Sequence, residues 1–422
     1  MMPSLRRPAV LPARGGPERG EHSSPAAGQG GRSFAGRAMA RAGGWIRAPA
    51  GRLFRSAGPV VAGLIGALVL ALLAPPLRAE VAGTDILGRA VVLAAPAQRI
   101  VLGDGRHMAV LGLLLDDPVA RVAGWRLDKP LDPPTLAAWR AKFPAIDAIA
   151  PVGAGNRGLS AEAVIALAPD LVVLSLIDAA DPGSQRARDQ IAAAGIPIAY
   201  VDFFSHPLEN AMPSLALLGR LTGAEARAAE FAAFYQGRID RIRDRLAAAD
   251  PPRPRVFFHV HAAPVNCCST VGSGVFDDFI RLAGGQNVAA GAVQGVLGNV
   301  SLEFLLAADP DIYIATGGTH MAARGGLVLG SGVDAATARD SFARLIAAPG
   351  FSALRAVEEG RAAGVWHLFN DTPAHLALVE YLARTFHPEL FPDIDPEATL
   401  AEIGRRFAPV TVPGHWWIRA GD

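Results

Sequence analysis

Cysteine is almost absent from this chain of 422 residues, which contains only the adjacent pair Cys267 and Cys268. Neighbouring cysteines cannot join distant segments, so the sequence excludes a small secreted fold held together by disulfides. The pair itself leaves two states open, a vicinal disulfide that rigidifies a turn and two small buried thiols. A hydrophobic content of 51% indicates that ordinary apolar cores stabilise the chain instead.

Acidic residues are scarce in the N-terminal segment. Residues 1–79 hold eleven arginines but only two acidic side chains, among many Gly, Pro, Ser and Ala residues. This composition predicts a disordered leader. An uncharged apolar run over residues 56–77 follows four arginines, as in a secretory signal. Its length fits either cleavage near Ala79 or an uncleaved membrane anchor, and the lack of a following cysteine argues against a lipoprotein.

The leader also changes how the net charge is interpreted. It carries +9, which leaves about −8 for residues 80–422 of a chain whose net charge is +1. An acidic domain is a poor candidate for binding nucleic acid, so the sequence predicts no nucleic-acid partner.

From Thr84 onward, short β-rich segments alternate with helical segments. This alternation predicts βαβ units and largely parallel sheets flanked by helices. The segments fall into two groups, so we expect an α/β fold with an N-terminal lobe over residues 84–221 and a C-terminal lobe over residues 254–415. The expected strands are 99–103, 121–125, 171–174 and 198–203 in the first group, and 255–261, 311–316 and 364–369 in the second.

The longest helical pattern lies between the two groups, over residues 223–249. Thr222 followed by Glu225 is typical of a capping box at a helix start, and a proline-rich segment ends the pattern. A helix of about 26 residues is roughly 39 Å long at 1.5 Å per residue. We therefore expect residues 222–250 to form a rigid helix joining the lobes; a surface helix inside one domain is the alternative.

One motif occurs once in each group. Residues 159–174 read LSAEAVIALAPDLVVL, and residues 300–315 read VSLEFLLAADPDIYIA. In both, a serine lies two positions before a glutamate, and Pro-Asp follows before a β-rich run. Serine suits an N-cap and glutamate suits the first helical turn, so Glu162 or Glu303 alone is an ordinary helix-start acid. Local structure does not explain why the whole unit recurs.

The chain from about Thr84 to His415 resembles the periplasmic binding proteins of ABC importers for ferric siderophores, haem and cobalamin. The matching segments are TDILGRAVVLAAPAQRIV, GLSAEAVIALAPDLVV, GIPIAYVDF, PLENAMPSLALLGRLTGAEARA and VSLEFLLAADPDIYI. The resemblance implies two lobes joined by one long helix, a ligand in the cleft between them, and no enzymatic activity. It also implies that Glu162 and Glu303, one on each lobe, dock into arginine pockets of a membrane permease.

The resemblance further implies a periplasmic monomer that captures an iron(III) complex of the siderophore type and delivers it to the permease. Cobalamin and haem are alternative ligands of the same type, and His107, His320 or His367 would be the axial ligand of a haem. No resident cofactor or metal site is expected, because the iron complex is cargo.

Ligands of open α/β sheets bind beyond the carboxyl ends of the strands. Arginine suits the anionic oxygens of a chelate, and aromatic rings suit its flat apolar parts. The residues after the expected strands are therefore the candidate ligand-binding residues: Arg106, His107, Trp125 and Arg157 in the N-terminal lobe, and His261, Cys267, Cys268, His320, Trp366 and Asn370 in the C-terminal lobe.

An exported two-lobed metalloenzyme is the alternative from another functional class. His259 and His261 would share one face of a strand and could ligate a metal together with Asp277 or Asp278. The sequence shows no nucleophile–base or acid–base constellation beside them. It therefore favours a binding protein without catalytic residues.

Overall fold

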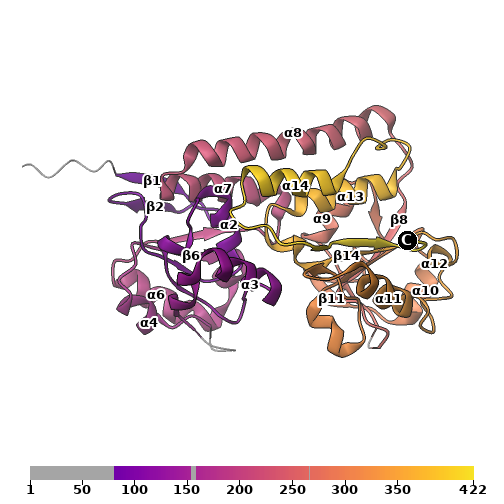
Figure 1. Cartoon of the computed structure of the whole chain (residues 1–422), viewed down its shortest axis with the longest axis horizontal. Coiled ribbons are helices and arrows are strands. Elements are labelled where there is room, and N and C mark those ends of the chain that lie inside the picture. The colour runs from indigo at the N-terminus through magenta and orange to yellow at the C-terminus, as the bar shows by residue number, and fades with distance from the viewer. Residues whose placement is uncertain (1–79, 154–157, 266) are drawn as a thin grey trace, which may run out of the picture. The chain divides into compact units, whose positions relative to one another are not determined.

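The computed structural model describes residues 80–153, 158–265 and 267–422 (Figure 1). The predicted leader 1–79 and the candidate Arg157 lie outside the described residues. From Glu80 onward the chain belongs to one compact unit that contains two five-stranded sheets and their flanking helices. The predicted α/β fold with two mainly parallel sheets is confirmed, whereas the exact lobe boundaries stay a prediction.

The N-terminal sheet consists of parallel strands in the order β5-β4-β3-β6-β7. Its central strands are buried on both faces, which explains their continuous apolar sequences. A short antiparallel hairpin, β1 with β2, precedes it. The elements are β1 (Val81–Thr84), β2 (Ala90–Leu93), β3 (Ile100–Leu102), α2 (His107–Leu114), β4 (Val122–Trp125), α3 (Pro133–Lys142), β5 (Ala150–Pro151), α4 (Ala161–Ala166), β6 (Leu171–Ser175), α5 (Leu176–Ala180), α6 (Gln185–Ala193), β7 (Ile198–Val201) and α7 (Pro207–Thr222).

The C-terminal sheet has the order β10-β8-β12-β14-β16, and only β16 runs antiparallel to its neighbour. Two small antiparallel pairs, β9 with β11 and β13 with β15, lie outside it. The elements are β8 (Arg255–His259), β9 (Ser269–Val271), α9 (Phe276–Leu282), β10 (Gln286–Asn287), β11 (Leu297–Asn299), α10 (Leu302–Ala308), β12 (Ile312–Gly317), β13 (Gly330–Ser331), α11 (Ala335–Ile346), α12 (Arg355–Glu358), β14 (Ala362–Trp366), α13 (His375–Phe386), α14 (Pro396–Arg406), β15 (Gly414–His415) and β16 (Trp417–Arg419).

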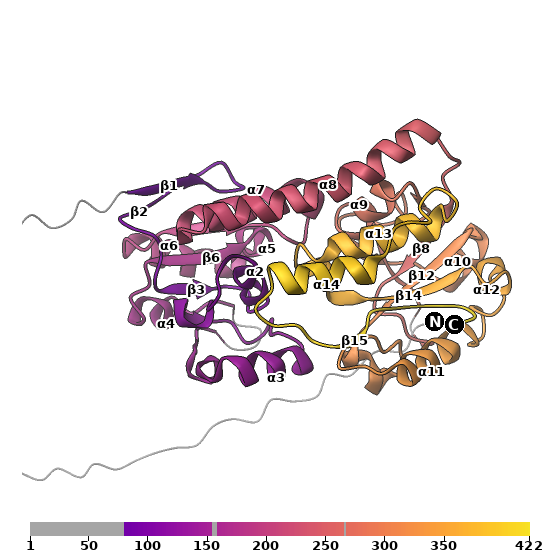
Figure 2. The ribbon, with the colours of Figure 1, turned by 45° about the horizontal axis from the view of Figure 1, so that its top comes forward.

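Helix α8 (Glu225–Ala249) is the long helix expected between the two groups, and it packs against both (Figure 2). It contacts α2 and α7 on one side and α13 on the other. Its apolar face is buried, with Phe231 edge-on to Phe407 at 4.9 Å. Arg227 on α8 donates hydrogen bonds to the backbone oxygens of Leu113 (3.0 Å) and Phe407 (2.9 Å). This one side chain therefore connects α8 to the C-terminal ends of both α2 and α14.

The predicted start of this helix is wrong. Thr222 is the last residue of α7, and its hydroxyl donates to the backbone oxygen of Leu218 at 2.7 Å. Gly223 follows with a positive φ of 76°, the left-handed conformation that ends many helices. The new helix begins at Glu225 with no side-chain cap on Ala224. The Ser/Thr-x-x-Glu pattern thus spans a glycine turn between two helices and does not form a capping box.

The repeated motif makes the same kind of contact in the N-terminal half of the molecule, which contains the first sheet, and in the C-terminal half, which contains the second. Asp170 accepts hydrogen bonds from the backbone of Arg99 at 3.0 Å and of Gln98, and Asp311 accepts one from the backbone of Arg255 at 2.8 Å. Each aspartate of a Pro-Asp pair therefore holds the residues that lead into the first strand of its own sheet. This gives the repeat a structural reason that is independent of its glutamates.

Direct contacts join the two halves besides α8. The hydroxyls of Thr135 and Ser331 lie 2.8 Å apart, and the backbone N–H of Val275 donates to the oxygen of Ser205 at 2.9 Å. Lys142 reaches the backbone oxygen of Pro409 at 2.6 Å. Among the described residues no helix is long and apolar enough to cross a membrane.

Candidate ligand-binding site

An ion pair lies just after β3, the strand of the N-terminal sheet that comes first in the chain. Arg106 donates two hydrogen bonds to Asp104, from Nε to Oδ1 at 2.9 Å and from Nη2 to Oδ2 at 2.6 Å. Burial alone would raise the pKa of Asp104, but the adjacent Arg106 guanidinium holds it well below its usual range. Gly105 is required between them, because a Cβ there would lie 2.9 Å from the backbone oxygen of Lys129. The pair is therefore fixed in place by the loop after β4.

Arg106 also contacts the C-terminal half. Its Nη1 lies 2.7 Å from Oδ1 of Asp371, which ends the short 3-10 helix His367–Asp371 after β14. Neither oxygen of Asp371 has a hydrogen bond of good geometry, although the side chain is buried. Burial raises the pKa of Asp371 to about 6, against the opposing effect of Arg106. A buried carboxylate of the C-terminal half is thus held by a single ion pair with an arginine of the N-terminal half.

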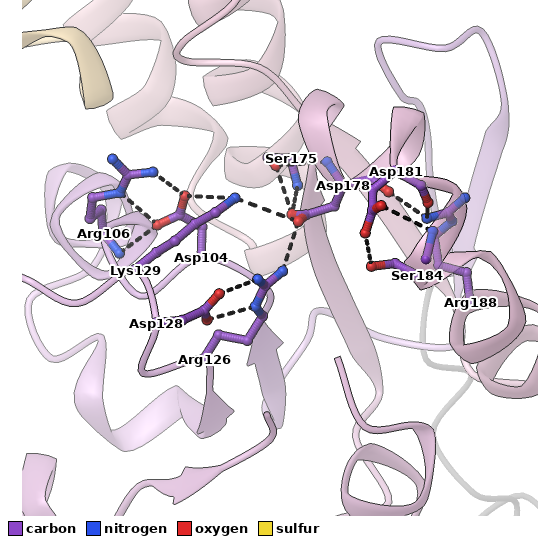
Figure 3. A network of polar contacts seen from close by, with 11 residues as sticks. Asp104, Arg106, Arg126, Asp128, Lys129, Ser175, Asp178, Asp181, Ser184 and Arg188 are labelled. Atoms are coloured by element: carbon purple, nitrogen blue, oxygen red, sulfur yellow. Dashed lines mark hydrogen bonds and ion pairs between the residues drawn. The ribbon is translucent and has the colours of Figure 1, made fainter. Parts of the chain in front are cut away.

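The basic side chains around Arg106 are already paired (Figure 3). Arg126 contacts Asp128 and donates to Asp178 at 2.8 Å, and Lys129 lies 3.5 Å from Asp178 and 3.8 Å from Asp104. Three cations therefore face three carboxylates on the N-terminal side, and Asp371 adds a fourth acid from the other side. These carboxylates would compete with an anionic ligand for the three cations.

Two buried polar atoms near this ion network lack a hydrogen-bond partner. They are Nδ1 of His107, at the start of α2, and Oδ1 of Asn370, beside Asp371. His107 packs edge-on to Phe203 at 5.6 Å, and burial lowers its pKa. Unsatisfied buried polar atoms are rare in folded proteins and often mark the place of a water or a ligand. The two atoms come from opposite halves of the molecule.

Three histidines meet at the carboxyl ends of β8, β12 and β14. Nδ1 of His261 lies 2.9 Å from Nε2 of His320, and the ring of His367 lies 3.8 Å from that of His261, centre to centre. The hydroxyl of Thr316 accepts from the backbone N–H of His261 and pairs with Nδ1 of His367 at 3.0 Å. Burial lowers the pKa of all three rings, that of His261 to about 4. The rings are therefore neutral at pH 7.

Two cavities border this region. One of about 580 Å³ is lined by His261, Ala263, Val265, Ser269, Met321 and Arg324. The other, of about 400 Å³, is apolar and includes the rings of Trp366, Phe369 and Trp416, with Thr135 from the N-terminal half at its edge. Trp366 contacts Trp416 edge-on at 4.9 Å. Aromatic walls of this kind suit flat, apolar parts of a ligand.

Comparison with known proteins identifies the family. Residues 118–364 match the family described as periplasmic binding protein, which is more than half of the chain. The chain belongs to the periplasmic binding protein family. Members of this family are non-enzymatic transport components that work outside the cytoplasm, so the prediction of a protein without catalysis is confirmed.

Individual relatives support the same family. A TroA-like periplasmic binding protein, FepB from Veillonella parvula, is 28% identical with a TM-score of 0.74, covering 81% of this chain and all of its own. A cobalamin-binding protein of Halobacterium salinarum is 30% identical over 155 residues, 36% of this chain and 39% of that protein. A vitamin B12-binding protein of Yersinia pestis is 28% identical over 163 residues, 38% of this chain and 54% of that protein. The chain thus matches about half or less of these two curated relatives.

The structure of this periplasmic binding protein groups several predicted ligand residues and separates others. Arg106, His107 and Asn370 lie near the boundary between the halves, and His261 and His320 form a pair. Trp125 is buried in the core, 7% exposed. Cys267 and Cys268 lie just before β9 with their sulfur atoms side by side, outside the residues that line either cavity.

Other residues of the site were missed by the sequence analysis. Arg126, Lys129 and Arg324 were not predicted, whereas His367 and Asp371 lie in the candidate segment, Trp366 to Asp371, at the end of the last expected strand. Arg126 directly follows β4, so the rule that selected Trp125 could have selected it too. The sequence could not show that Asp371 pairs with Arg106, because Arg106 lies 265 positions earlier and only the folded chain brings them together.

The two repeated glutamates are exposed at corresponding places. Glu162 lies in the first turn of α4 and Glu303 in the first turn of α10. Each helix starts with a serine N-cap, as predicted, and the capping hydroxyls accept from the backbone three residues on at 3.2 Å in both cases. Ile165 and Leu306 follow the glutamates by three positions and are each 39% exposed. Both helices thus present an acid and an aliphatic side chain one turn apart.

The residues of the metalloenzyme alternative do not form one site. His259 is buried, pairs with the hydroxyl of Tyr313 at 2.6 Å and stacks on Phe351, whereas His261 faces His320. Asp277 bonds to Asn287. Within the described part of the chain, no three His, Cys, Asp or Glu side chains are arranged as a metal site.

Proposed function

We propose that this periplasmic binding protein is the substrate-binding component of an ABC importer and captures an iron(III) complex of the siderophore type between its two halves. The observation that carries the proposal is the buried contact of Arg106 with Asp371, flanked by the unpartnered polar atoms of His107 and Asn370. These groups lie beyond the carboxyl ends of strands from both sheets, where open α/β sheets bind ligands. Arg106 would exchange Asp371 for an anionic oxygen of the chelate.

A corrinoid is the second candidate ligand. The curated relatives are named as cobalamin-binding and vitamin B12-binding proteins, and the cavity beside Trp366 and Trp416 offers aromatic walls for a flat macrocycle. Binding of a corrinoid should depend less on Arg106 than binding of a ferric siderophore. A corrinoid presents amides and one phosphate, whereas a ferric siderophore presents several anionic oxygens around its metal. The two candidates therefore differ in how strongly they depend on this arginine.

Titration calorimetry with a ferric tris-catecholate, haemin and cyanocobalamin tests the proposal. We expect 1:1 binding of the ferric complex, weakened at least tenfold by Arg106→Ala. Arg361→Ala is the matched control, because Arg361 is exposed at the opposite end of β14. Binding of cyanocobalamin alone would replace the first candidate by the second. The absence of binding to all three ligands would refute both.

We also propose that Glu162 and Glu303 dock the loaded protein onto the permease. Both are exposed in the first turn of a capped helix, and each has an exposed aliphatic neighbour, Ile165 or Leu306. An exposed carboxylate can pair with arginine in bidentate geometry, and two such points on separate helices would fix the orientation of the partner. The aliphatic side chains would add apolar contact beside each ion pair.

The N-terminal segment gives the proposed route to the periplasm. We propose that residues 56–77, which lie outside the described residues, direct export of the chain and are then removed by cleavage near Ala79. The exported protein would be a monomer. N-terminal sequencing of protein from the periplasmic fraction tests this. A retained leader would instead indicate the membrane-anchored form.

A further inference from the structure

The two adjacent cysteines differ in how far solvent reaches them. Cys267 is partly exposed, whereas Cys268 is completely buried in an apolar cluster that also contains Leu305 of α10. Their sulfur atoms lie side by side. A reagent from solvent therefore meets the sulfur of Cys267 first, because the reactivity of a cysteine requires access. Members of this family work outside the cytoplasm, where disulfides form and persist.

Backbone hydrogen bonds connect Cys268 to the start of α10. The N–H of Cys268 donates to the oxygen of Val300 at 2.8 Å, and the N–H of Val300 donates to the oxygen of Cys268 at 3.0 Å. This reciprocal pair continues the ladder between β9 and β11. Val300 directly precedes Ser301, the N-cap of α10, and the first turn of this helix carries Glu303. A change in the backbone torsions of Cys268 therefore acts on the residue before the helix.

The residue on the other side of Cys268 faces a cavity. Ser269 lines the cavity of about 580 Å³, together with His261. The backbone oxygen of Ser269 accepts a hydrogen bond from the N–H of Val260 at 2.8 Å. The buried cysteine thus lies on the stretch of chain that runs from the wall of this cavity to the start of α10.

We propose that Cys267 and Cys268 are a reversible redox site that exchanges with disulfides outside the cytoplasm, and that its state alters the start of α10. The Cys267 thiolate attacks one sulfur of the incoming disulfide, which forms a mixed disulfide and releases one thiolate. The Cys268 thiolate then attacks the Cys267 sulfur and releases the second thiolate. Two electrons pass to the incoming disulfide, and the two protons of the cysteine thiols pass to the released thiolates.

The bond between the two sulfurs closes a small ring and so restricts the backbone torsions of both cysteines. The dithiol leaves these torsions free to vary, and the Cys268–Val300 hydrogen bonds should then open more often. The consequence for delivery rests on the proposed function, because it requires Glu303 on α10 to dock the permease. The thiol exchange itself needs neither a ligand nor a permease.

Intact-mass spectrometry of the exported protein tests the exchange. Protein that is reduced with dithiothreitol, freed of the reductant and treated with oxidised glutathione should lose two hydrogen atoms per chain. Cys268→Ala should instead keep one glutathione on Cys267, and Cys267→Ser should gain none, because its remaining thiol is buried. Two free thiols in the treated parent, or the adduct on Cys267→Ser in place of Cys268→Ala, would overturn the redox site.

Hydrogen–deuterium exchange of the reduced and the oxidised parent tests the effect on α10. The amides of Cys268 and Val300 should exchange about tenfold faster in the reduced protein. The start of α4 is the matched control, because its N-cap Ser160 donates to the backbone oxygen of Val152 at 2.8 Å and the N-terminal half contains no cysteine. Equal exchange of Val300 in both states, or an equal change at Ser160, would overturn the link to α10. These measurements use no ligand, so calorimetry with the ferric tris-catecholate judges the proposed function separately.

Discussion

Replacing Asp371 by asparagine should stabilise the protein at neutral pH. Asp371 is buried, its carboxylate has a single ion pair with Arg106, and burial raises its pKa to about 6 from 3.8. The folded protein therefore binds this proton more tightly than the unfolded chain. The stabilisation that results is fully present below about pH 4 and is lost as the pH rises to about 6. Asparagine mimics the protonated acid and does not show this loss.

The size of the effect follows from the shift in pKa. One pKa unit corresponds to 1.36 kcal/mol, so a shift from 3.8 to about 6 amounts to about 3 kcal/mol once the group is fully ionised in both states. Part of the loss has already occurred at pH 4.5. Between pH 4.5 and pH 8, the free energy of unfolding of the parent should therefore fall by about 2 kcal/mol relative to Asp371→Asn.

Urea unfolding at pH 4.5, 6 and 8, followed by circular dichroism, measures this difference. Asp104→Asn is the matched control with the opposite sign, because Arg106 holds the pKa of Asp104 well below its usual range. Its carboxylate stabilises the folded state above about pH 4 and stops doing so only in stronger acid, so Asp104→Asn should be destabilised by nearly the same amount at all three pH values. The reasoning is refuted if Asp371→Asn is less stable than the parent at pH 8, or if the difference does not vary with pH.

Two further predictions concern delivery and motion. Glu162→Lys combined with Glu303→Lys should abolish uptake of the ligand by cells and leave the affinity of the purified protein for the ligand unchanged. The control Glu358→Lys on α12 should change neither uptake nor affinity. An equal loss of uptake and affinity in the double variant would reject the docking role. Because α8 and the contacts between the halves resist hinge closure, small-angle scattering curves with and without ligand should coincide, and a clear fall in the radius of gyration on binding would contradict this.

Most of the fold could be predicted from the sequence because local signals and burial agree along the strands. The run over residues 171–174 is apolar at every position, as a parallel strand buried on both faces requires, and it is observed as β6. The final expected strand, 364–369, ends earlier, at Trp366. The chain turns into a 3-10 helix there, and that turn carries His367, Asn370 and Asp371 to the site.

The site itself was only partly predictable, because its geometry depends on long-range contacts. The rule that ligands lie after parallel strands selected Arg106 and His261, which lie after β3 and β8 as expected. It could not show that Arg106 forms an ion pair with Asp371, or that the neutral rings of His261 and His320 form a hydrogen bond of 2.9 Å. It also placed Trp125 in the cleft, whereas this ring fills the core after β4.

Anomalous diffraction at the iron absorption edge, from crystals grown with a ferric chelate, tests the central claim most directly. Our account predicts one iron peak between the two halves of the molecule, with Arg106 turned from Asp371 to the chelate and the His261–His320 pair on the facing side. A peak only on the outer surface, or an intact Arg106–Asp371 pair in the loaded protein, would contradict it.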